Sequence, residues 1–209
     1  MGKTSDRMAR AARYLNARPF SLSLIAVTDP NRLPDPAVAL RAVPRGGALI
    51  WRAYDKKPDY PAARALASGL RARDGILLIA GAPDFARRLG IDGIHLPEYS
   101  ITRHRHGTFR HDVPAVIVTA ACHSEKAVIA ASRAGVDAVL ISPALPTESH
   151  PDGKSLGIPR FARLVRVADG LGLPAYALGG ISTPAHVARL RGTGAKGIAG
   201  IGFILGSGT

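Results

Sequence analysis

The sequence has little cysteine and no long apolar run. Its 209 residues include a single cysteine, Cys122, so no disulfide can form within the chain. No apolar run reaches the ~18 residues that a membrane-spanning helix needs, so we expect no membrane partner. The basic amino end is not followed by an apolar segment with a cleavage site, so we expect no secretory signal peptide. These features predict a cytoplasmic protein.

Acidic residues are also scarce. The chain has 15 Asp and Glu against 28 Lys and Arg, a net charge of +13. Basic charge indicates nucleic-acid binding when it is clustered together with a recognition motif. Here the arginines are spread through the chain, with denser groups only at the amino end and at residues 103–111. Because steering of anionic ligands explains the charge equally well, we expect a phosphorylated small molecule and not nucleic acid as the partner.

Short apolar runs recur along the whole chain. They are mostly continuous, as is typical of parallel strands that are buried on both faces. The expected strands are Leu22–Val27, Ala48–Trp51, Ile76–Ala80, Gly93–Leu96, Ala115–Thr119, Ala138–Ile141, Ala175–Leu178 and Gly197–Ile201.

Helix-like segments separate these runs. The expected helices are Pro61–Arg73, Pro83–Leu89, Ser124–Ala134, Pro159–Ala168 and Pro184–Arg191. Alternating strands and helices indicate βαβ units. We predict an α/β fold, a (β/α)8 TIM-type barrel with a shortened fourth helix and a truncated eighth helix; an open doubly wound sheet is the alternative. Residues 1–18 form a basic N-terminal extension of helical composition, and residues 19–209 form one barrel domain.

Glycines follow the last two expected strands. Gly179 and Gly180 lie between a strand and a helix, and Gly200 and Ile201 end the last strand. Glycine lets the backbone approach a ligand closely. Phosphate sites of such barrels lie in the loops after the seventh and eighth strands. We therefore expect phosphate binding here, and tight turns alone are the alternative.

Three polar side chains lie at other expected strand ends. Arg52 suits a phosphate or carboxylate ligand, or alternatively a surface ion pair with Asp55. His95 would face the top of the barrel, or hydrogen-bond a neighbouring loop. His123 follows the fifth strand, where a histidine can move a proton in either direction. The adjacent Cys122 is expected to be buried and inert.

Two further segments contain polar residues. The segment 142–150 is long and proline-rich for a βα loop, which predicts a lid or specificity loop. His104, His106 and His111 lie among arginines without a cysteine or carboxylate cluster, so we expect no metal site there.

The order of these motifs resembles the thiamine phosphate synthase and TenI superfamily. The resemblance extends from about Leu22 to Ile201. It rests on Val-Thr-Asp29-Pro30, Arg52, Gly93-Ile-His95-Leu96, Cys122-His123-Ser124, Ser142-Pro143 to Pro146-Thr147 and Ala177-Leu-Gly179-Gly180-Ile181. It implies a barrel that binds a thiazole phosphate through Gly179, Gly180, Gly200 and Ile201, with further contacts from Arg52, His95, Ser142, Pro143 and Thr147. It also implies that His123 is the acid/base of TenI tautomerases, which use no metal.

Several positions depart from the synthase pattern. The resemblance leads us to expect a lysine where Tyr54 stands, with Lys56 displaced, and an Asn-Asp pair where Ala80-Gly81 stands. Synthases also have a second aspartate near Pro97–Ser100, where this chain offers only Glu98 as an oxygen ligand for Mg²⁺. The synthase pattern also has a lysine after the Pro-Thr loop. In this chain Lys154 lies further along than that position.

These departures leave three hypotheses. The leading one is a TenI-like protein that binds thiazole phosphate and aromatises it through His123, without cofactor. The second is a thiamine-phosphate synthase that joins thiazole phosphate to hydroxymethylpyrimidine diphosphate with Mg²⁺. The third is a non-catalytic regulator that binds a phosphorylated ligand. We also expect a homodimer.

Overall fold

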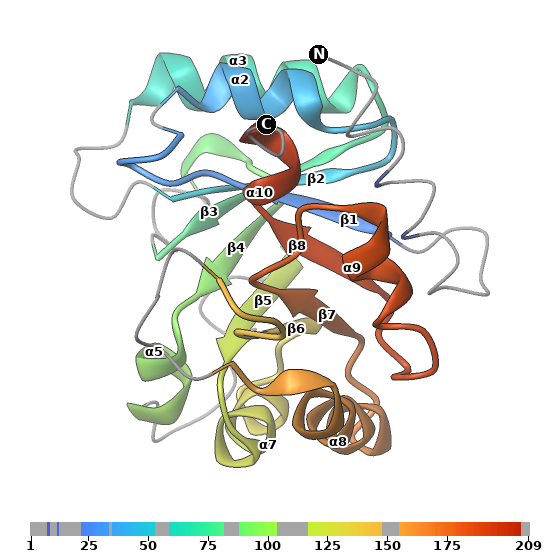
Figure 1. The fold of residues 1–209 in the computed structure, drawn as a ribbon. Coiled ribbons are helices and arrows are strands. Elements are labelled where there is room, and N and C mark those ends of the chain that lie inside the picture. Colours follow the sequence, from blue (N-terminus) through green and yellow to red (C-terminus); the bar gives the residue numbers. More distant parts are fainter. Residues whose placement is uncertain are drawn as a thin grey trace.

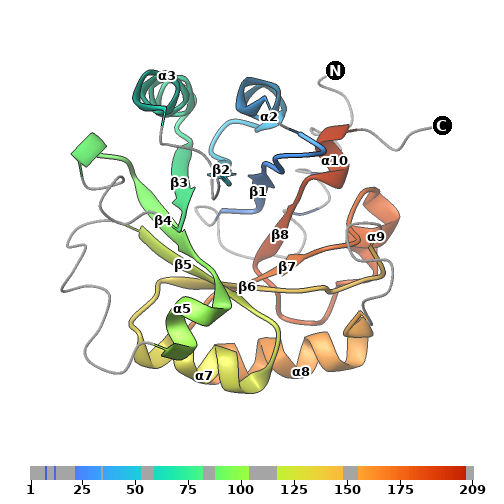
Figure 2. The same ribbon diagram turned by 90° about the vertical axis from the view of Figure 1, so that its left-hand side faces the viewer.

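Eight parallel strands form a closed barrel, in which each strand pairs with the next and β8 pairs with β1 (Figures 1 and 2). The computed structural model describes residues 8, 12, 22–33, 35–52, 59–81, 88–103, 117–147 and 155–205. The strands are β1 (Leu24–Val27), β2 (Ala48–Trp51), β3 (Ile76–Ala80), β4 (Gly93–Leu96), β5 (Ile117–Cys122), β6 (Ala138–Ile141), β7 (Ala175–Leu178) and β8 (Gly197–Gly200). The closed ring confirms the predicted barrel and excludes the open sheet.

The helices lie outside the ring of strands (Figure 2). They are α2 (Pro36–Ala42), α3 (Tyr60–Arg71), α5 (Glu98–Arg103), α7 (Glu125–Arg133), α8 (Gly157–Gly170), α9 (Pro184–Ala188) and α10 (Gly202–Leu205). Within the described residues, α5 after β4 has six residues and α10 after β8 has four. Both lengths agree with the predicted shortened fourth helix and truncated eighth helix. Among the described helices, none is long and apolar enough to cross a membrane.

The strand boundaries differ from the prediction at three strands. β1 begins at Leu24, β8 ends at Gly200, and β5 continues to Cys122 instead of ending at Thr119. β5 is longer because its last residues keep pairing on both sides, Ala120 with Leu96 and Cys122 with Ile141. His123 therefore follows the strand directly, as expected.

The helix ends show which local signals were read correctly. Ser124 caps α7 by accepting a hydrogen bond from the Ala127 amide, and Gly135 follows with φ +71°, as predicted. The sequence reasoning missed α2, although Asp35 accepts from the Ala37 amide at 2.8 Å and Pro36 occupies the first turn. The Asp35-Pro36 pair was the sequence signal for the start of this helix, because an aspartate cap is followed by a proline in the first turn. α9 ends at Ala188, three residues before the predicted end.

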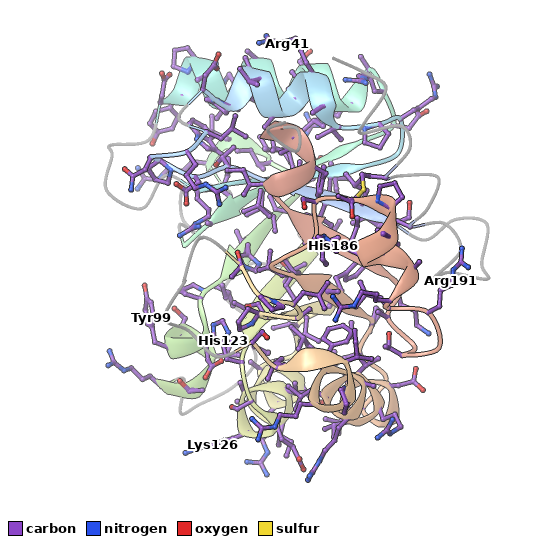
Figure 3. All side chains as sticks on the ribbon, viewed as in Figure 1. Arg41, Tyr99, His123, Lys126, His186 and Arg191 are labelled. Carbon is purple, nitrogen blue, oxygen red and sulfur yellow. The ribbon has the colours of Figure 1, made fainter. Side chains whose placement is uncertain are left out.

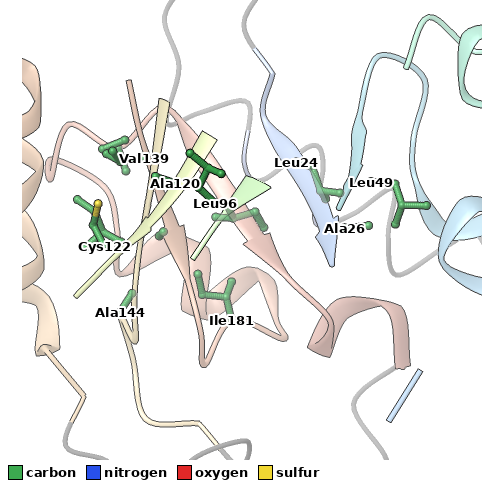
Figure 4. Close-up of a cluster of buried hydrophobic side chains, with 14 of the residues drawn as sticks. Leu24, Ala26, Leu49, Leu96, Ala120, Cys122, Val139, Ala144 and Ile181 are labelled. Atoms are coloured by element: carbon green, nitrogen blue, oxygen red, sulfur yellow. The ribbon is translucent and has the colours of Figure 1, made fainter. Parts of the chain in front are cut away.

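Two apolar clusters make up the core. The inner cluster fills the barrel and contains Ile25, Val27, Ala48, Ile50, Leu78, Ala80, Ala138, Leu140, Tyr176 and Ala199. The larger outer cluster includes the other faces of the strands and the apolar faces of the helices, and Figure 4 shows part of it. Met8 and Ala12 are helical and fully buried in this outer cluster, while the rest of residues 1–18 lies outside the described part of the chain.

Alternation along the strands decides which side chains face the barrel interior. On β4, Ile94 and Leu96 belong to the outer cluster, so His95 between them faces inward. The register places His95 beside Thr119 of β5. Arg52 and Ser142 each lie two residues beyond an inward-facing strand residue, Ile50 and Leu140. Polar side chains therefore begin at the middle of the barrel and continue to its carboxyl end.

Candidate active site

An ion pair lies at the carboxyl ends of β1 and β2. Arg52 Nη1 is 3.4 Å from Asp29 Oδ2, and the Arg52 amide donates to Thr28 Oγ1 at 2.8 Å. Asp29 Oδ1 also accepts from the amides of Asn31 and Arg32, at 3.0 Å each. The partner of Arg52 seen here is thus Asp29, while the proposed partner Asp55 lies outside the described residues.

The two backbone hydrogen bonds and the arginine control the ionisation of Asp29. Partial burial alone would raise the pKa of this carboxyl. The amides of Arg32 and Asn31, with the charges of Arg52 and Arg32, outweigh burial and hold the pKa of Asp29 below its ordinary value. Asp29 is therefore an ionised carboxylate that stabilises the position of Arg52.

His95 is buried inside the barrel, with 6% of its surface exposed. Its Nδ1 lies 2.9 Å from Thr119 Oγ1, and the Thr119 hydroxyl donates to Ile94 O at 3.3 Å. Because a hydroxyl has one proton to donate, this network puts a proton on His95 Nδ1 and leaves Nε2 as an acceptor. Burial, helped by the charge of Arg52, lowers the pKa of His95 to about 4. His95 is thus a neutral imidazole whose ring contacts Thr119 on the next strand, while its carbonyl accepts from the Gly81 amide in the loop after β3 at 2.9 Å.

His123 is the exposed histidine at the end of β5 (Figure 3). Its Nδ1 lies 2.9 Å from Ser142 O and 3.1 Å from Ser142 Oγ, on the loop after β6. A carbonyl oxygen can only accept, so Nδ1 carries a proton, and in the neutral tautomer the lone pair is on Nε2. The main chain of His123 is held separately, because its amide donates to Glu98 Oε2 at 2.6 Å. The hydrogen bond therefore selects the tautomer in which Nε2 is the nitrogen able to accept a proton.

Cys122 lies on the opposite face of β5 from the barrel interior. It is fully buried in the outer cluster, as Figure 4 shows. Burial, with a contribution from Glu98, raises the pKa of the Cys122 thiol to about 12. Since the thiolate is the nucleophile, Cys122 is inert, as predicted.

The loop after β6 packs against the loop after β7. The Ala144 amide donates to Leu178 O at 2.9 Å, and the Leu145 amide donates to Gly179 O at 3.2 Å. Both donors are buried. These bonds continue the pairing of β6 and β7 beyond the strands. The first part of this loop is thus hydrogen-bonded to the barrel, its role as a lid or specificity loop stays a prediction, and residues 148–150 lie outside the described part.

Gly179 and Gly180 allow this close contact. Their φ values are +92° and +73°, in the left-handed region that favours glycine. A Cβ on Gly179 would lie 3.2 Å from Pro143, and one on Gly180 would lie 2.3 Å from Pro146 O. The structure therefore gives both glycines a packing role. Their phosphate-binding role stays a prediction.

The remaining predicted contacts lie on the same loops. The Leu156 amide donates to Pro143 O at 2.9 Å, and Thr147 is half-buried at the end of the described loop. At the end of β8, Gly200 is buried, and Ile201, which follows the strand, is half-buried. The next residue, Gly202, closely approaches the loop after β7, since a Cβ there would lie 3.2 Å from Ser182 Cβ. The loops after β6, β7 and β8 are thus brought together, while Arg52 directly follows β2.

The described carboxylates near the strand ends, Asp29 and Glu98, already have hydrogen-bond partners. Mg²⁺ requires octahedral oxygen coordination, commonly with one or two carboxylates. Both oxygens of Asp29 are engaged by amides and Arg52, and Glu98 Oε2 accepts from the His123 amide. No group of three potential metal-ligating side chains occurs within the described residues. The segments with Tyr54, Asp55, Lys56, Lys154 and the three histidines at 104, 106 and 111 lie outside them.

Three residues around the candidate site were missed or misread from the sequence. Thr119 holds His95, and His186 Nδ1 accepts from the Ser182 amide at 3.3 Å. Glu98 was considered only as a metal ligand, whereas it binds the His123 amide. The register of β4 and β5 could have revealed Thr119, since it lies opposite His95. The contacts of Glu98 and His186 depend on side-chain direction, for which the sequence has no signal.

Fold and site together define a (β/α)8 barrel with an exposed histidine, His123, at the carboxyl end of β5. Residues 24–204 match the family described as thiamine monophosphate synthase, so the chain belongs to that family of thiamine biosynthesis. A putative thiamine-phosphate synthase 2 of Aquifex aeolicus is 34% identical over 142 residues, which cover 68% of this chain and 71% of that protein. A thiamine-phosphate synthase of Methanoculleus marisnigri is 30% identical over 176 residues, 80% of this chain and 79% of that protein.

A solved structure supports the fold independently. The thiamine phosphate pyrophosphorylase from Pyrococcus furiosus aligns with a TM-score of 0.72 and covers 89% of this chain and 88% of its own. At 22% sequence identity this likeness concerns the fold alone.

Proposed function

We propose that this chain binds a thiazole phosphate at the carboxyl ends of its strands and that His123 moves the proton that aromatises it. The observation that carries the proposal is the hydrogen bond from His123 Nδ1 to Ser142 O at 2.9 Å. It leaves Nε2 free to take a proton from the non-aromatic ring and to return one at another position. Because tautomerisation moves a proton without net change, one residue that is base and then acid is sufficient.

The loop geometry supports a phosphate site on the opposite side of the ligand. The loops after β7 and β8 approach each other at Ser182 and Gly202, and both contain glycines without side chains to block a ligand. This is where barrels of this type hold phosphate. A phosphate bound there would leave the thiazole ring between these loops and the β5 and β6 side, where His123 and Ser142 lie.

A second candidate function is thiamine-phosphate synthesis. It is favoured by the names of the relatives, several of which are thiamine-phosphate synthases. The described carboxylates Asp29 and Glu98 already accept hydrogen bonds from main-chain amides. Residues 53–58 and 82–87, which follow β2 and β3, lie outside the described part. Diphosphate release from the two synthase substrates with Mg²⁺ distinguishes this function from tautomerisation.

The test measures aromatisation of the thiazole phosphate by ultraviolet absorbance, with ligand affinity from calorimetry. We expect wild type to accelerate the reaction without added metal, and His123→Ala to lose ~10²–10⁴-fold in rate while its affinity changes little. Lys126→Ala, exposed on α7, is the control and should behave as wild type. Binding without any acceleration by wild type would refute the tautomerase, and diphosphate release would then separate a synthase from a non-catalytic regulator.

A further inference from the structure

Glu98 connects the carboxyl end of β4 to that of β5. It is the first residue of α5, directly after the Leu96–Pro97 exit from β4, and it is half-buried. Its Oε2 accepts the His123 amide at 2.6 Å. Hydrogen bonds to ionised acceptors are shorter and about twice as strong as neutral ones. The contact therefore fixes the main chain of His123 relative to the neighbouring strand.

His123 is held from its other side by Ser142. That residue is buried on the β6 side, and its carbonyl and hydroxyl oxygens both lie within 3.1 Å of His123 Nδ1. The main chain is thus fixed from β4 and the ring from β6. With both ends fixed, the direction of Nε2 is determined by the protein before a ligand arrives.

We propose that Glu98 is a positioning residue, which sets the direction of His123 Nε2 through the main chain and does not touch the substrate. This inference rests on the proposed function, because it assigns Glu98 a part in the same proton transfer. A displacement of ~1 Å at a reacting group can lower a rate by ~100-fold, so a fixed main chain matters here. Glu98 thereby acts on the rate of proton transfer and not on ligand affinity.

Position and charge can be separated by substitution. Glu98→Gln keeps an oxygen that can accept the His123 amide but removes the negative charge, whereas Glu98→Ala removes both. Glu125 offers a matched control, because it begins α7 as Glu98 begins α5. It is the first residue of α7 and forms an ion pair with Arg163 at 3.0 Å, away from the His123 amide. Glu125→Gln therefore removes one negative charge near His123 without removing its hydrogen bond.

The experiment measures kcat and KM for thiazole phosphate aromatisation, together with the NMR amide signal and amide hydrogen exchange of His123. For Glu98→Ala we expect kcat to fall ~10–100-fold with KM within about twofold, and exchange of the His123 amide to accelerate. Glu98→Gln should keep kcat within about threefold of wild type and keep the amide protected. Glu125→Gln should match wild type in all three measurements.

Three results would overturn the proposal. Unchanged kcat and unchanged His123 amide exchange in Glu98→Ala would show that the contact positions nothing. An equal loss of kcat in Glu98→Gln and Glu98→Ala would assign the effect to charge. A rise in KM with kcat unchanged would make Glu98 a ligand contact. If wild type shows no turnover, the proposed function fails, and the amide exchange still decides whether Glu98 fixes His123.

Discussion

Replacing Gly180 by alanine tests the contact between the loops after β6 and β7. Gly180 has φ +73°, and a Cβ would lie 2.3 Å from Pro146 O and 2.6 Å from Leu145 O. The left-handed backbone costs an alanine about 1–2 kcal/mol. Crowding against the two carbonyls adds about 1–3 kcal/mol. We expect a total loss of about 2–5 kcal/mol, and each 1 kcal/mol lowers the Tm by ~2–4 °C for a chain of this size.

Gly180→Ala should also change the position of the His123 ring. To relieve the contact, the loop after β6 must move by most of an ångström, and that loop begins with Ser142, which holds the His123 ring. A displacement of ~1 Å can lower a catalysed rate by ~100-fold. We therefore expect Gly180→Ala to lose aromatisation activity at temperatures where it is still folded, as measured by circular dichroism at the assay temperature.

Gly172→Ala is the matched control for this prediction. Gly172 has φ +72°, nearly that of Gly180, but no atom lies within 4 Å of a Cβ placed there. It should show only the backbone cost of about 1–2 kcal/mol and keep full activity. Thermal melts and urea unfolding of both variants give the comparison. Equal melting temperatures and equal activities in the two variants would refute the close loop contact.

The remaining predictions concern buried or paired groups. Burial lowers the pKa of His95 from 6.5 to about 4. Between pH 6.5 and pH 4 the His95 side chain therefore binds a proton more readily in the unfolded chain than in the folded protein. Stability should fall by up to ~3 kcal/mol as pH drops from 6.5 to 4, and urea unfolding of His95→Gln should lack this part of the slope. Arg52→Met should raise the pKa of Asp29, followed by carbon NMR; an unchanged pKa would contradict the ion pair. A thiol reagent at pH 8 should label Cys122 only in urea, and labelling of the native protein would contradict its burial.

The fold was largely predictable because its signals are local and repeated. A continuous apolar run such as Ala138–Ile141 can satisfy its side chains only when both faces are covered, which selects a parallel strand between helices. Pro and Gly limit the helices between these runs. The end of β5 was misplaced because Ala120–Cys122 lacks bulky apolar residues, so that only its pairing with β4 and β6 shows it to be strand.

The candidate site was predictable only as positions along the chain. Strand ends identify His95 and His123, because the carboxyl ends of parallel strands converge in a barrel. The surroundings of the two histidines could not be predicted from their positions along the chain. His95 is neutral and buried beside Thr119, whereas His123 is exposed and held by Ser142. Those differences arise from side-chain direction and register, which are properties of the assembled barrel.

Glu98 links the two enzymatic hypotheses, because the carboxylate that accepts the His123 amide is also the one that the synthase pattern would use for Mg²⁺. Its Oε2 accepts that amide at 2.6 Å, and Asp29 on the other side of the barrel is engaged by two amides and Arg52. A carboxylate has about four lone-pair sites on its two oxygens, so Glu98 can accept the His123 amide through Oε2 and still offer lone pairs to a metal. Diphosphate release from the two synthase substrates with Mg²⁺ is therefore the measurement that separates the synthase from proton transfer by His123.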